Sequence, residues 1–64
     1  MKNLLNQIET LTTVFLKDAS SQLDKGNKAA GLRARRASLE LEPLLKRFRK
    51  LSLEAAASGK GQDN

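Results

Sequence analysis

The sequence predicts an all-α fold, an antiparallel two-helix hairpin, which we expect to assemble into a four-helix bundle. Apolar residues recur in alternating steps of four and three in both halves of the chain, and no strand-like alternation is present. The dipeptide Gly26-Asn27 separates the two periodic segments, and so short a turn makes the helices antiparallel neighbours. With 64 residues and no Cys, the chain is at most one domain and has no disulfide to support a small core.

The first helix is predicted over about residues 3–25. Its apolar stripe consists of Leu4, Ile8, Leu11 and Phe15, and Leu5, Ala19 and Leu23 widen it. The charged residues Glu9, Lys17, Asp18 and Asp24 are expected to lie mostly off this stripe.

The turn carries signals for the end of one helix and the start of the next. Gly26 suits a left-handed C-terminal cap because it has no Cβ. Asn27 can accept a hydrogen bond from the first turn of the following helix as its N-cap.

The second helix is predicted over about residues 28–57, with a kink near Pro43, so that the hairpin spans residues 1–57 and a flexible tail spans 58–64. Its seam consists of Ala30, Ala34, Ala37, Leu41, Leu44, Phe48, Leu51 and Ala55. Pro43 lies opposite this seam and the heptad phase continues past it, which favours a bend convex toward solvent over a turn.

Small size favours self-association, because one core of fewer than about 70–80 residues rarely supplies more than ~3–5 kcal/mol of stability. We therefore expect a homodimer, with a homotetramer as the alternative. The predicted oligomer interface consists of Leu41, Leu44, Leu45, Phe48 and Leu51.

The positive charge is concentrated on the second helix. The chain has a net charge of +5, whereas residues 1–27 are neutral and residues 28–50 carry +6. Arg33, Arg36, Arg47 and Lys50 are predicted on one flank nearly opposite the seam, and Lys28, Arg35, Lys46 and Arg49 on the adjacent flank. Such a face suits a phosphate backbone. The alternative is a solvated face on which Glu40 and Glu42 pair locally with Arg36, Lys46 or Arg47.

Composition excludes several functions. The chain has no His and no Cys, so we expect no zinc site, no cofactor and no enzymatic activity. No apolar run approaches the ~20 residues of a membrane span, and no signal-peptide core follows Lys2, so we expect a cytoplasmic protein.

The favoured function is binding of double-stranded DNA without sequence preference. Both Phe residues occupy seam positions, which argues against base stacking on a single strand. The alternatives are a helical adaptor that pairs with a partner helix and, least favoured, a peripheral membrane binder that uses the basic face.

Several segments resemble the bacterial linker-histone-like family, also called chlamydial histone-like proteins. The resemblance covers about residues 1–57 and rests on Lys25–Gly31, Arg33–Arg35, Ala37–Glu42 and Phe48–Ser52. It implies a DNA-binding, nucleoid-associated protein with a role in chromosome compaction, located at the nucleoid. It also implies DNA contacts by the matching basic residues Lys28, Arg33, Arg35, Arg49 and Lys50. The sequence departs from the expected family pattern in two respects. It has no long Lys- and Ala-rich tail, and it has Pro43 where the family is expected to carry Lys.

Overall fold

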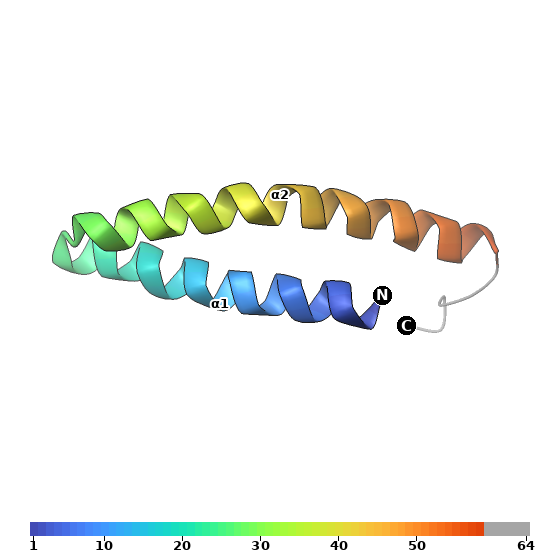
Figure 1. Ribbon diagram of the computed structural model, residues 1–64, viewed down its shortest axis with the longest axis horizontal. Helices are drawn as coiled ribbons and strands as arrows, with labels where there is room; N and C mark the ends of the chain where they lie inside the picture. Colours follow the sequence, from blue (N-terminus) through green and yellow to red (C-terminus); the bar gives the residue numbers. More distant parts are fainter. Residues whose placement is uncertain (59–64) are drawn as a thin grey trace.

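The protein is an antiparallel hairpin of two long α-helices, as the computed structural model of residues 1–58 shows (Figure 1). Helix α1 spans Lys2–Lys25 and helix α2 spans Lys28–Ala57. The two helices lie side by side in a rod whose extents are 47 × 19 × 16 Å. The predicted all-α hairpin is therefore confirmed.

The turn between the helices uses both of the predicted caps. Gly26 adopts a left-handed conformation (φ 67°, ψ 25°), and its N–H donates to the carbonyl of Gln22 at 2.8 Å. The Asn27 side-chain oxygen accepts a hydrogen bond from the Ala30 N–H at 3.1 Å. These two bonds satisfy backbone groups that the helix ends would otherwise leave unpaired.

Small residues bring the helices into closest contact near the turn. Ala30 is fully buried, and Ala34 and Ala37 are each 4% exposed. Gly31 lies directly against the Gln22 side chain, so that a Cβ at residue 31 would collide with the amide of Gln22. Small seam residues therefore set a short distance between the helices at this end.

Larger residues fill the seam farther from the turn, where packing is looser. Leu41, Leu44, Phe48 and Leu51 are half-buried on the side of α2 that faces α1, and among the large apolar residues of α1 only Leu4 is buried. The core consequently runs the length of the hairpin without enclosing any large side chain completely.

Helix α2 continues through Pro43 without interruption. It bows gently, with its convex side away from α1 (Figure 1). Since proline has no N–H, the carbonyl of Leu39 receives no hydrogen bond from residue 43, and both residues are exposed to solvent. Beyond Ser58, the predicted tail lies outside the described residues.

Two predictions for the first helix are wrong. Leu23 was expected to widen the buried stripe, but it is 83% exposed, and Leu5 is 47% exposed. Asp18, expected off the stripe, is only 7% exposed. The physical reason is a strict four-three spacing along α1, which carries the contact line from Leu11 and Phe15 to Asp18 rather than to Leu23.

Candidate nucleic-acid interface

The outer face of α2, which points away from α1, carries six of the twelve Lys and Arg residues of the chain. We define it by six exposed cationic residues that recur at helical spacing. These residues are Lys28, Arg35, Arg36, Lys46, Arg49 and Lys50. Within the described chain none of them lies within 4.0 Å of a carboxylate, so their charge is available to an anion.

Arg33 is placed differently from the prediction. Its Nε donates to Asp18 Oδ2 and its Nη2 donates to Asp18 Oδ1, both at 3.3 Å. The Asp18 side chain is 10% exposed and the Arg33 side chain is 54% exposed. Arg33 therefore lies at the edge of the contact between the helices, where it neutralises a buried carboxylate.

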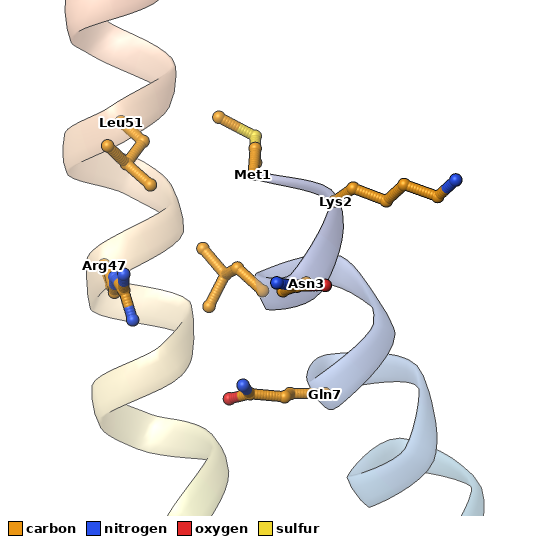
Figure 2. Close-up of a pocket in the computed structure, with 7 residues that line it drawn as sticks. Met1, Lys2, Asn3, Gln7, Arg47 and Leu51 are labelled. Atoms are coloured by element: carbon orange, nitrogen blue, oxygen red, sulfur yellow. The ribbon is translucent and has the colours of Figure 1, made fainter.

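Arg47 also borders α1 rather than the outer face. It lines a groove together with Asn3, Leu4 and Gln7 of α1, and Leu51 of α2 lines the same groove. Figure 2 shows Arg47 and Leu51 across from the first turns of α1, and the side chain of Lys2, a residue that also lines the groove, extends away from α2. Arg47 and Arg33 were both predicted to lie nearly opposite the seam, and both predictions are wrong.

The physical reason is the helical angle between positions three residues apart. Arg33 and Arg47 each precede Arg36 and Lys50 by three residues, a rotation of about 60° around the axis at 3.6 residues per turn. That rotation places the first pair beside the seam and leaves the second pair on the outer face. The four residues thus form two columns rather than one.

Local ion pairing does not account for the charge of the outer face. Within residues 1–58 the one ion pair shorter than 4.0 Å joins Arg33 and Asp18. Glu40 and Glu42 make none with Arg36, Lys46 or Arg47, although the sequence allowed that alternative. The outer face is therefore a net positive surface along about six turns of helix.

Sequence reasoning missed two residues that shape this region. Asp18 is the buried partner of Arg33, and its signal was its place in the four-three spacing of α1. Gly31 allows close packing against Gln22, and its signal was a glycine inside a helix, where that residue is unfavourable. These signals lie within single helices, whereas the partners of Asp18 and Gly31 follow only from the alignment of the two helices.

The described helices contain no candidate for a membrane span, since no window of α1 or α2 combines the required length and hydropathy.

Comparison with known proteins identifies a family. The family model described as histone H1-like protein Hc1 matches residues 2–58, which is nearly the whole chain. No curated protein sequence and no solved structure gives a significant match.

Proposed function

The chain belongs to the histone H1-like Hc1 family, and from that premise we propose that it binds double-stranded DNA without sequence preference as a nucleoid-associated protein. Its role in this proposal is the organisation or compaction of the chromosome. The outer face of α2 makes the main contacts, and the likeness of the family to histone H1 supports a DNA ligand.

One observation carries this proposal most strongly: six cations share one face of α2, and within the described residues none is paired with a carboxylate. Lysine and arginine that neutralise phosphates release condensed counterions, which favours binding regardless of base sequence. Arg33 and Arg47, predicted as further contacts, lie beside this face and extend the positive surface toward α1.

The proposal includes self-association as a homodimer or a homotetramer. The hairpin encloses no large side chain completely, which supports a need for further burial. Of the predicted interface residues, Leu45 is 42% exposed, whereas Leu41, Leu44, Phe48 and Leu51 are half-buried against α1.

The proposed role is architectural rather than enzymatic, with the nucleoid as the site of action. Membership in a histone-like family supports both statements.

Fluorescence anisotropy with labelled duplexes of equal length and unrelated sequence tests the proposed function. Dissociation constants that agree within about threefold support recognition of the phosphate backbone. A preference of a hundredfold or more for one duplex would show that base edges are recognised and would overturn the proposal.

A second candidate function is a helical adaptor. Leu32, Leu39 and Leu53 are 44%, 64% and 72% exposed on the outer face of α2, where a partner helix could cover them. This candidate is favoured over DNA binding if the protein fails to shift the anisotropy of any duplex at low salt.

A further inference from the structure

The positive charge of α2 is interrupted near the middle of the helix. Residues 28–36 carry four positive charges and residues 46–50 carry another four, whereas residues 37–45 carry two negative charges and no positive one. Glu42 is exposed and, within the described part of the chain, forms no ion pair. A single row of phosphates along the whole of α2 would therefore meet an uncompensated carboxylate halfway along the helix.

Cations alternate with leucine or glutamate along the centre of the outer face. A second four-three spacing runs along α2 on the side away from α1. The residues that follow it are Lys28, Leu32, Arg35, Leu39, Glu42, Lys46, Arg49 and Leu53. Leu32 and Leu39, which are 44% and 64% exposed, fall in the intervals between cations. The cations of the outer face therefore form separate groups rather than a continuous row.

The axial distances between these groups match the distances between the two strands of B-DNA. At 1.5 Å per residue, Lys28 precedes the pair Arg35 and Arg36 by about 11 Å, and that pair precedes Arg49 and Lys50 by about 21 Å. One turn of B-DNA is about 34 Å long and contains a minor groove about 6 Å wide and a major groove about 12 Å wide. With about 6 Å added for the phosphates that border each groove, a line parallel to the duplex axis crosses successive strands about 14 Å and about 20 Å apart.

We propose that α2 lies along the duplex axis and holds the two strands across the major groove, an inference that rests on the proposed binding of DNA. Arg35 and Arg36 contact phosphates of one strand, and Arg49 and Lys50 contact phosphates of the other. Lys28 reaches the next strand across the minor groove, so that each chain covers one turn of the duplex, about 10 base pairs.

The middle of α2 suits a position over the major groove. Leu39 and Glu42 lie in the interval that faces the groove, so that neither is pressed against a phosphate. Helix α2 bows with its convex side away from α1, which directs this middle part toward the groove (Figure 1). An α2 that followed one strand would instead hold the Glu42 carboxylate against the phosphates.

Duplexes with neutral methylphosphonate linkages test whether each chain contacts both strands. In one duplex every linkage of one strand is neutral, and in the other every second linkage of both strands is neutral, so the two carry equal charge. The duplex with alternating linkages should bind at least threefold more tightly, because each group of cations still finds phosphates on its own strand. Equal affinities, or tighter binding to the duplex with one neutral strand, would overturn the proposal.

A matched pair of variants tests the assignment of the cations to separate strands. Arg35→Gln with Arg36→Gln removes one group, whereas Arg36→Gln with Lys50→Gln removes the same charge but takes one cation from each group. The preference for the alternating duplex should disappear or reverse in the first variant, since Lys28, Arg49 and Lys50 then contact a single strand. It should remain at least threefold in the second variant, and both should retain their helical circular dichroism. A wild-type preference in the first variant would refute the assignment.

Substituents placed in one groove test which groove separates the two groups. The C5 atom of cytosine faces the major groove and the N2 atom of guanine faces the minor groove. A glucosylated hydroxymethyl group on C5 of the cytosines should weaken binding at least tenfold, whereas a benzyl group on N2 of the guanines should weaken it less than threefold. Equal losses, or a larger loss for the guanine substituent, would overturn the proposal.

Binding of the unmodified duplex distinguishes this geometry from the proposed function. A protein that binds no unmodified duplex at low salt would refute the proposed function itself. A protein that binds the unmodified duplex but shows neither the strand preference nor the groove preference would retain DNA binding and refute the major-groove geometry.

Discussion

The Arg33 guanidinium pairs with the Asp18 carboxylate through two hydrogen bonds of 3.3 Å that link the two helices. Asp18 occupies a contact position where an apolar residue is usual, and Arg33 reaches it from the edge of α2. Because a buried carboxylate without its partner is costly, the pair disfavours any register that separates the two residues.

Removal of the partner should destabilise the hairpin. For Arg33→Gln we expect a loss of about 1–3 kcal/mol in the free energy of unfolding, less than for a fully buried pair because Arg33 is half exposed. Urea denaturation followed by circular dichroism measures this loss. Arg36→Gln, on the outer face, is the control and should change stability by less than about 0.5 kcal/mol. Equal midpoints for the two variants would show that the pair contributes nothing.

The turn depends on the left-handed conformation of Gly26. Gly26→Ala should cost about 1–2 kcal/mol, because a Cβ is strained at φ 67° although nothing lies within 4 Å of it. Denaturation midpoints measure the change, and Ala29→Ser, in the first turn of α2 and exposed, serves as the control. A Gly26→Ala variant as stable as the wild type would mean that the turn adopts another conformation.

Gly31 and Gln22 should be energetically coupled. In a Gln22→Ala background, Gly31→Ala should stabilise the protein by about 1 kcal/mol, the usual gain for alanine over glycine in a helix. In the wild type the gain should be smaller or absent, because the new methyl group must displace the Gln22 amide. A double-mutant cycle of unfolding free energies measures the difference. Equal gains in both backgrounds would exclude the contact.

The general architecture was predictable from the sequence, whereas the pairing of side chains across the hairpin was not. Periodicity and turn chemistry are local, so they identified both helices and the caps at Gly26 and Asn27. The pairing of Asp18 with Arg33 depends on how the helices align, which no single helix encodes.

The placement of charge was predictable in part for the same reason. The concentration of cations on α2 follows from counting residues, but the division into an outer face and a column beside the seam requires the contact geometry. Arg33 and Arg47 therefore lie closer to α1 than predicted, whereas Arg36 and Lys50 lie on the outer face. The DNA contacts and the oligomer interface remain predictions.

Phe48 is a test of the looser end of the hairpin. The ring is half-buried, so Phe48→Ala should cost about 1–3 kcal/mol, less than the ~3–5 kcal/mol typical of a fully enclosed ring. Urea denaturation at several protein concentrations checks this value. A loss above about 4 kcal/mol would mean that the ring is enclosed more fully in solution than in the single hairpin.

The salt dependence of duplex binding tests the central claim, that the outer face of α2 binds the phosphate backbone. If about three to four phosphates are neutralised per chain, a dimer should show a log–log slope near −6, at about −0.9 per phosphate. The variant with Arg35, Arg36, Arg49 and Lys50 all replaced by Gln should flatten that slope by at least half and retain its helicity. Lys2→Gln with Lys17→Gln, on the neutral first helix, should leave the slope nearly unchanged. A quadruple variant with the wild-type slope and affinity would contradict the account.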